Sequence, residues 1–151
     1  MSVAEEMSVT LYARDVMERD PLFVDEDTSC RRLAELMSES RHGFALIRDA
    51  KGEAVGIVTE WDLVNKVLAR GLDPSSTSAG DVMTRGVVSV DAGEELSDVA
   101  ELMAKRGIRR VMVTERGKIV GFITCRIVLA NLKSYVDSVS RDLARYGLLP
   151  F

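Results

Sequence analysis

The sequence predicts an α+β protein built from two copies of one unit, each with the order strand, helix, strand, strand, helix. Three landmarks support this duplication. "DVM" at residues 15–17 and "AELM" at residues 34–37 both recur 66 positions later, and the glycines that open two similar phrases, Gly56 and Gly121, lie 65 positions apart. Self-similarity at a fixed period is the sequence signature of a repeat architecture. The shorter third offset indicates one extra residue in the first copy.

The sequence of the first copy predicts the following elements, in chain order. Residues 22–24 form a short extended piece, and a helix follows whose apolar residues have helical spacing: Leu33, Leu36 and Met37. "FALI" at residues 44–47 and "AVGIVT" at residues 54–59 are two strands joined by a turn that contains Gly52. A second helix begins after the threonine that ends this phrase. The extra residue is placed in the turn "RDAKGE".

The sequence of the second copy predicts the same elements in the same order. Residues 87–90 are extended, and the helix that follows has apolar positions at Leu96, Val99, Leu102 and Met103. "RVMV" and "KIVGFIT" are the two strands, and Gly117 lies in their turn, as a tight hairpin requires. After the second copy, "NLKSYVDSVSRDLARYG" continues as an amphipathic helix that ends near Gly147.

These elements divide the chain into five segments. A linker between the two repeats is indicated by the small polar residues, Gly and Pro of "GLDPSSTSAG". The expected boundaries are an N-terminal extension at 1–12, a first repeat at 13–72, the linker at 73–79, a second repeat at 80–133, and a C-terminal helix and tail at 134–151. Because a repeat of about 60 residues has a marginal core, we expect the two to pack about a pseudo-twofold axis, with a ligand site where they meet.

Composition limits the function classes. The net charge of -4 and the pI of about 5.1 argue against a broad nucleic-acid interface, which needs a basic face. The N-terminus does not resemble a signal peptide, and no apolar run approaches the ~20 residues of a membrane helix, so we expect a soluble, cytoplasmic protein. Cys30 and Cys125 are expected to be buried free thiols. Neither they nor His42 form a metal-ligand or catalytic pattern.

One phrase carries candidate chemistry. "GIVTEWD" in the first copy places Thr59 where strand becomes helix and Asp62 in the first helical turn. A carboxylate there can accept both hydroxyl protons of a ribose diol, and the threonine can donate to a phosphate or ribose oxygen. The same Thr-x-x-Asp spacing is also a helix capping box, which needs no ligand. The second copy reads "GFITCRI", where Ile127 cannot accept a hydrogen bond.

These phrases and the order of elements resemble the cystathionine-β-synthase (CBS) domain, here as a tandem pair over residues 13–133. The resemblance implies a regulatory module that binds an adenosine-containing ligand between its repeats, reports it to an unidentified protein partner and is not an enzyme. It also implies a homodimer formed through the helices after "TEWD" and "TCRI", which offer these apolar residues: Leu63, Val64, Val67, Val128, Leu129 and Leu132.

The resemblance also assigns a phosphate-binding role to basic residues of the second copy. In such pairs, positions of one repeat reach a phosphate whose ribose is held by the aspartate of the other repeat. The positions here are Arg109, Arg110 and Arg126, and none of their first-copy counterparts is a cation: Gly43, Phe44 and Trp61. Arginine suits a phosphate through its planar, bidentate donors. One complete site and one degenerate site are therefore expected.

The complete site needs a place for the purine. We expect an apolar slot formed by Ile57 or Val58 and by the backbone near Thr84, Val87 and Val88. AMP is the favoured ligand, because three cations suit a compact phosphate. ADP, ATP, S-adenosylmethionine and methylthioadenosine remain alternatives, as does a ligand-free structural or dimerisation module.

Overall fold

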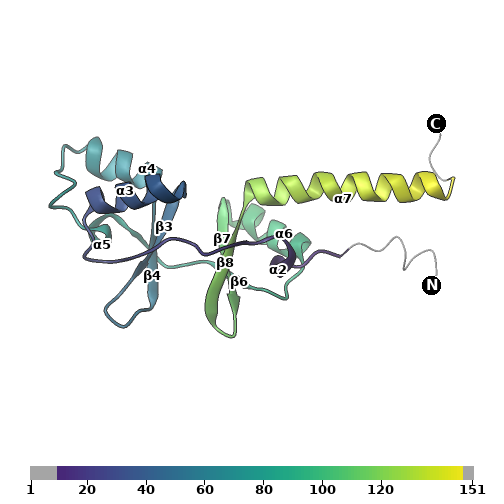
Figure 1. Cartoon of the computed structure of the whole chain (residues 1–151), viewed down its shortest axis with the longest axis horizontal. Coiled ribbons are helices and arrows are strands. Elements are labelled where there is room, and N and C mark those ends of the chain that lie inside the picture. Colours follow the sequence, from purple (N-terminus) through teal and green to yellow (C-terminus); the bar gives the residue numbers. More distant parts are fainter. Residues whose placement is uncertain (1–9, 148–151) are drawn as a thin grey trace. The chain divides into compact units, whose positions relative to one another are not determined.

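The computed structural model describes residues 10–147, which form two compact units (Figure 1). Unit 2 is the continuous stretch Asp20–Val88. Unit 1 combines the residues up to Arg19 with Ser89 and the residues that follow it. Each unit contains one mixed sheet with helices, so the predicted α+β class with two repeats is confirmed.

Unit 2 contains a four-stranded sheet in the order β2-β3-β4-β5. Strands β2 and β3 are parallel, and the other neighbouring pairs are antiparallel. Figure 1 shows α3 and α4 on the same side of β3 and β4. In chain order the elements are β2 (Phe23–Asp25), α3 (Cys30–Ser40), β3 (Phe44–Arg48), β4 (Ala54–Thr59), α4 (Glu60–Leu63), the π-helix η1 (Val64–Leu68), α5 (Ala79–Val82) and β5 (Thr84–Arg85).

Helix α3 shows how the local sequence produces this packing. Ser29 caps its start by accepting a hydrogen bond from the Arg32 N–H at 3.1 Å. The predicted helical spacing then buries Leu33 and Met37 on one face. Both contribute to a core that strands and helices share: Val24, Cys30, Leu33, Met37, Ala45, Ile47, Val58, Val67, Ala79 and Val82.

Unit 1 repeats this architecture with the sheet order β1-β8-β7-β6. Strands β6 and β7 are parallel, and β8 is antiparallel to both of its neighbours. The buried side chains of its core include Val90, Val99, Met103, Val111, Val113 and Ile123. In chain order its elements are α2 (Ala13–Val16), β1 (Glu18–Arg19), β6 (Ser89–Asp91), α6 (Leu96–Arg106), β7 (Arg110–Glu115), β8 (Lys118–Thr124) and α7 (Cys125–Arg145).

The two hairpins differ as the repeat offsets predict. Only Arg116 and Gly117 lie between β7 and β8, and both have positive φ, 53° and 76°, as a two-residue hairpin turn of type I′ requires. Between β3 and β4 the connection is longer, and Asp49 organises it by accepting from the N–H groups of Lys51 and Glu53. The extra residue of the first copy therefore lies in this turn.

Each sheet takes an edge strand from the segment that precedes the other repeat's core. Strand β1, from the first "DVM" region, pairs with β8, whereas β5, from the second, pairs with β4. Gly56 and Gly121 allow these close approaches, since a Cβ on Gly56 would lie 2.7 Å from the Thr84 carbonyl oxygen and one on Gly121 would lie 2.5 Å from that of Glu18. The expected domain boundaries follow the repeats and stay a prediction.

The predicted C-terminal helix is confirmed as the second part of α7, which runs without a break from Cys125 to Arg145. Its first turns contact α2, α6 and β8, and Figure 1 shows the helix continuing well past α6. Among residues 10–147, no helix is both long and apolar enough to cross a membrane.

Candidate functional site

Thr59 and Asp62 form a complete capping box at the start of α4. The Asp62 carboxylate oxygen Oδ2 accepts from the Thr59 N–H at 2.8 Å and from the Thr59 hydroxyl at 3.1 Å. In return, the Thr59 hydroxyl oxygen accepts from the Asp62 N–H at 3.2 Å. The capping interpretation of the phrase is therefore confirmed. The box also fixes where the Asp62 carboxylate lies.

The other carboxylate oxygen of Asp62 faces a residue that the sequence analysis missed. Lys66 Nζ lies 3.1 Å from Asp62 Oδ1 and donates to the Val82 carbonyl oxygen at 2.8 Å. Lys66 lies in η1, one helical turn after Asp62. Opposite charges four residues apart on a helix are a signal that could have found this pair.

Unit 2 also brings the expected base-slot residues together. Ile57 and Thr84 are directly paired across β4 and β5, and the chain continues from β5 through Val87 and Val88, which are half-buried. Of the two apolar candidates on β4, Val58 is fully buried in the core, whereas Ile57 is only partly buried. Ile57 is therefore the side chain that a ligand can reach.

In unit 1, the three predicted arginines meet at the start of α7. Arg110 pairs with Thr124 across β7 and β8, and the Arg109 carbonyl oxygen accepts from the Cys125 N–H at 2.9 Å. Arg126 follows in the first turn of α7, with its side chain 88% exposed and a guanidinium nitrogen 3.9 Å from a Glu18 carboxylate oxygen. The backbones of the three arginines therefore lie together at the start of α7, and a helix N-terminus carries a partial positive charge that suits an anion.

The corresponding helix start in unit 1 keeps only half of the capping box. Thr124 accepts from the Ile127 N–H at 3.3 Å, but Ile127 has no side-chain oxygen to return a bond. Ile127 instead is buried, 8% exposed, among apolar residues. The predicted difference between the two copies therefore extends to their local hydrogen bonds.

Comparison with known proteins places this geometry in a family. The family model for the CBS domain matches residues 13–69 and again residues 79–134. The chain belongs to the CBS domain family. An uncharacterized protein of Methanopyrus kandleri is 30% identical over 133 residues, which are 87% of this chain and 68% of that protein.

Solved structures show the same CBS pair fold. A conserved protein of Pyrococcus horikoshii has a TM-score of 0.74 and 26% identity, covering 83% of this chain and 95% of that chain. The CBS domain pair of protein MJ0100, solved in complex with 5′-methylthioadenosine and S-adenosyl-L-methionine, has a TM-score of 0.72 and 24% identity, covering 83% and 98% of the two chains.

One of the two cysteines of this CBS pair differs from the expectation. Cys30 is buried as predicted, and burial, followed by the nearby Asp81 carboxylate, raises the pKa of its thiol. The prediction for Cys125 was wrong, because this residue is exposed. It directly follows the capping Thr124, at a position of α7 that does not face the core of unit 1. Among residues 10–147, no cluster of His, Cys, Asp and Glu could hold a metal ion.

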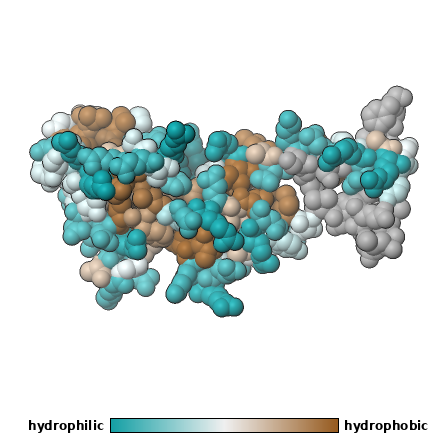
Figure 2. All heavy atoms as spheres, viewed as in Figure 1, coloured by the Kyte–Doolittle hydropathy of each residue, from teal (hydrophilic) through white to brown (hydrophobic). Residues whose placement is uncertain are grey.

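Only some of the apolar residues expected to form a dimer surface are exposed. Val64, Leu129 and Leu132 are exposed, but Val67 packs in the core of unit 2 and is unavailable to a partner. Figure 2 shows hydrophobic surface over the region of α4 and η1. Other exposed apolar side chains on or near these helices are Trp61, Leu68, Leu72 and Val136.

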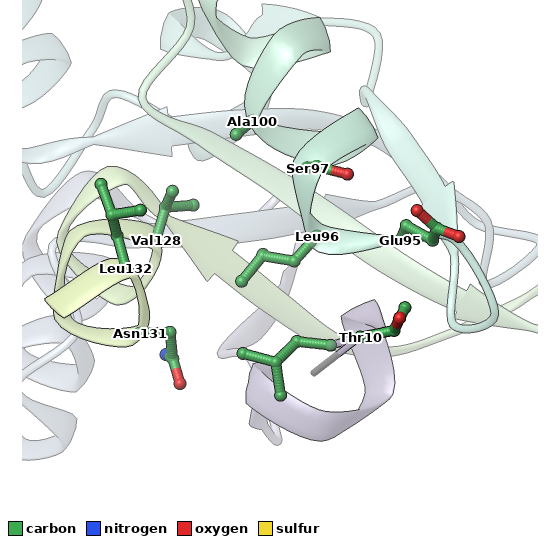
Figure 3. Close-up of a pocket in the computed structure, with 9 residues that line it drawn as sticks. Thr10, Glu95, Leu96, Ser97, Ala100, Val128, Asn131 and Leu132 are labelled. Carbon is green, nitrogen blue, oxygen red and sulfur yellow. The ribbon is translucent and has the colours of Figure 1, made fainter. Parts of the chain in front are cut away.

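A pocket of about 420 Å³ lies on unit 1 (Figure 3). Leu96 and Ala100 of α6 lie on one side of it and Val128 and Leu132 of α7 on the other. The remaining lining residues are Thr10, Leu11, Glu95, Ser97 and Asn131. None of its lining residues is a cation, so the pocket does not suit a phosphate. Its apolar wall is instead continuous with the exposed side of α7.

Proposed function

We propose that this CBS pair is a regulatory module that binds an adenosine-containing ligand and has no catalytic activity of its own. The Asp62 carboxylate would hold the ribose, and Ile57 with the β5 segment would contact the base. Arg109, Arg110 and Arg126 would bind the phosphate. The MJ0100 complex with methylthioadenosine and S-adenosylmethionine supports this ligand class.

The observation that carries the proposal is the position of the Asp62 side chain. Its carboxylate is 11% exposed and is fixed by three hydrogen-bonding or ionic contacts from Thr59 and Lys66. The contacts leave acceptor capacity on Oδ1, since a carboxylate oxygen can accept two hydrogen bonds. A preorganised acceptor of this kind binds a sugar hydroxyl without the entropic cost of ordering its own side chain.

AMP is the ligand we favour within this class. Three arginines lie at or next to the start of α7 in unit 1, one of them the largely exposed Arg126, in a chain whose net charge is -4. A local cationic cluster in an acidic protein favours one compact anion over extended polyanions. A ligand that binds one conformation more tightly than another would shift the population of the module, and a partner protein would respond to that shift.

Calorimetric titration of AMP, methylthioadenosine and S-adenosylmethionine tests the proposal. Asp62→Ala should weaken binding of the preferred ligand about 100-fold, since charge-assisted hydrogen bonds contribute about 1.5–3 kcal/mol each. Asp62→Glu should also bind weakly while it keeps the helix cap, because its longer side chain displaces the oxygens. Ile127→Val in the second copy is the matched control and should bind as the wild type does.

Three outcomes would each contradict one part of the proposal. Equal ligand affinity of Asp62→Ala and wild type would show that Asp62 does not contact the ribose. No binding of any of the three compounds would show that adenosine-containing ligands are the wrong class. If AMP bound no more tightly than methylthioadenosine, which has no phosphate, the proposed preference for a phosphate would be wrong. Arg126→Gln, whose side chain is exposed, should lower AMP affinity and leave methylthioadenosine affinity unchanged.

A second candidate function is a dimerisation module, which the exposed Leu129, Leu132 and Val136 of α7 favour. Exposed apolar side chains in one row on a helix are typical of an interaction surface. The pocket between α6 and α7 adds concave apolar area beside this row. Light scattering coupled to size-exclusion chromatography should give a dimer for the wild type and a monomer for Leu129→Ser/Leu132→Ser.

A further inference from the structure

Lys66 is the unexplained charged residue beside the candidate ribose carboxylate. Its side chain is 30% exposed, and its ammonium group contacts Asp62 Oδ1 at 3.1 Å and the Val82 carbonyl oxygen at 2.8 Å. Lys66 belongs to η1, and π-helical turns inside helices are frequent at functional sites. The position therefore calls for a specific role.

The hydrogen bonds of Asp62 limit how it can bind a sugar. Oδ2 already accepts two hydrogen bonds from Thr59, which uses its acceptor capacity. Oδ1 receives only the Lys66 ammonium and keeps room for one more donor. A diol that donated both protons to Asp62 would have to break the capping box. One ribose hydroxyl can bind Oδ1 without that cost.

The donors of Lys66 complement this arrangement. An ammonium group has three N–H donors, and its two contacts with Asp62 and Val82 account for two of them. A hydroxyl that donates to Asp62 Oδ1 still has lone pairs that can accept a hydrogen bond from the third N–H. The acceptor and the donor are adjacent, so one hydroxyl can satisfy both.

Lys66 also connects the carboxylate to the expected base slot. Val82 ends α5, and the chain continues through Met83 to Thr84, which pairs with Ile57. Through its bond to the Val82 carbonyl oxygen, Lys66 ties η1 to the end of α5, two residues before β5 begins. Lys66 therefore links the carboxylate of Asp62 to the segment that leads into the expected base slot.

The second copy has lost both members of the pair. Ile127 replaces the aspartate, and Asn131 occupies the position 65 residues after Lys66. Asn131 donates to the Ile127 carbonyl oxygen of its own helix at 2.8 Å. The pair of a carboxylate and an ammonium group is therefore present in unit 2 and absent from these positions of unit 1.

We infer that Lys66 and Asp62 together recognise one ribose hydroxyl, with Asp62 accepting its proton and Lys66 donating to its oxygen. Lys66 thereby makes the module selective for ribosides over deoxyribosides. This inference rests on the proposed adenosine-ligand function and assigns a specificity-determining residue within that site.

The test compares AMP, 2′-deoxy-AMP and 3′-deoxy-AMP by calorimetry, or the methylthioadenosine series if the wild type prefers that ligand. Wild type should bind one deoxy analogue at least about tenfold more weakly than the riboside, because its polar groups are then left unpaired. Lys66→Met should bind the riboside about tenfold more weakly and distinguish it less from that analogue, because only the Asp62 acceptor remains. Lys66→Arg should restore part of the discrimination, since it keeps the donors.

Lys51→Met is the matched control, because it removes the same charge from an exposed turn of unit 2. Thermal unfolding followed by circular dichroism checks that each variant is folded. Undiminished riboside selectivity in Lys66→Met, or a wild type that binds AMP and both deoxy analogues equally, would overturn the inference while leaving the proposed function intact. Failure of the wild type to bind any adenosine compound would instead overturn the proposed function.

Discussion

Helix α4 of unit 2 and helix α7 of unit 1 begin from the same template but with opposite chemistry. In unit 2, a reciprocal capping box and an ion pair hold the Asp62 carboxylate in place. In unit 1, Thr124 caps alone, Ile127 joins the core, and Arg126 follows the cap with an exposed guanidinium group. The backbone pairing around both starts is nevertheless the same, since Phe44 pairs with Thr59 and Arg110 with Thr124.

This difference shows which parts of the repeat are structural and which are free to change. The capping threonine remains in both units because it satisfies a backbone N–H of the helix, which costs stability when left unpaired. The side chain three positions later can be lost from the cap, because the bond from that residue's backbone N–H to the threonine hydroxyl does not depend on it. The duplicated fold can therefore acquire a carboxylate on one side and cations on the other without changing its backbone.

The largest difference that we expect between the units concerns their thiols. Cys125 should react with an aromatic disulfide reagent at least about a thousandfold faster than Cys30, because the Cys30 thiol is buried and must wait for local unfolding. Cys125→Ser and Cys30→Ala assign the two phases in a stopped-flow measurement at pH 8. Two phases of similar rate would mean that unit 2 opens readily.

The same thiol predicts a dependence of stability on pH. Burial and Asp81 raise the pKa of Cys30 in the folded state, so the unfolded chain loses this proton at a lower pH than the folded chain does. The protonated Cys30 thiol contributes fully to the stability of the folded state below the ordinary thiol pKa of about 8.5, and this contribution is lost as the pH rises through the folded-state pKa. Urea unfolding between pH 8 and 10 should show a smaller loss of stability for Cys30→Ala than for wild type.

The edge strands provide the next comparison. Gly56→Ala and Gly121→Ala should each lower the free energy of unfolding by about 2 kcal/mol, since the new methyl group overlaps the neighbouring backbone. Gly56→Ala should also weaken ligand binding, because it displaces β5, whereas the effect of Gly121→Ala on binding should be smaller. Lys118→Ala, an exposed position on β8, is the control. Wild-type stability in both glycine variants would contradict the close approach of these strands.

The smallest expected difference concerns the caps themselves. Thr59→Ala should cost about 1–2 kcal/mol and Thr124→Ala only about 0.5–1 kcal/mol, because Thr59 exchanges bonds in both directions and Thr124 in one. Serine at either position keeps the hydroxyl and should recover most of the loss. Urea denaturation of the four variants measures the difference. A greater loss at Thr124 would reverse the proposed ranking of the caps.

Much of the fold was predictable because its longer elements have strong periodic patterns. The strands "AVGIVT" and "KIVGFIT" and the helix around Leu33 were found from hydropathy alone. By contrast, α2, α5, β1 and β5 were missed, because elements of two to four residues are too short to show a period. The "DVM" landmarks marked these segments but did not reveal that each completes the other repeat's sheet.

The candidate site was predictable residue by residue rather than as a network. Thr59 and Asp62 were identified from one phrase, yet Lys66 was missed although it follows Asp62 by four positions. The choice between Ile57 and Val58 required knowledge of which face of β4 meets the core. Whether Cys125 is exposed likewise depends on which face of α7 it lies on. Apolar neighbours in the sequence do not reveal that face.

The route of the chain through the two units has a consequence for biosynthesis. Unit 2 is continuous from Asp20 to Val88, whereas unit 1 needs β1 from before this stretch and β8 from after it. Contacts within unit 2 can form while the ribosome is still producing α6, but the β1–β8 pair must wait until β8 has emerged. Glu18 and Arg19 thus remain without their sheet partner for more than 100 residues of further synthesis.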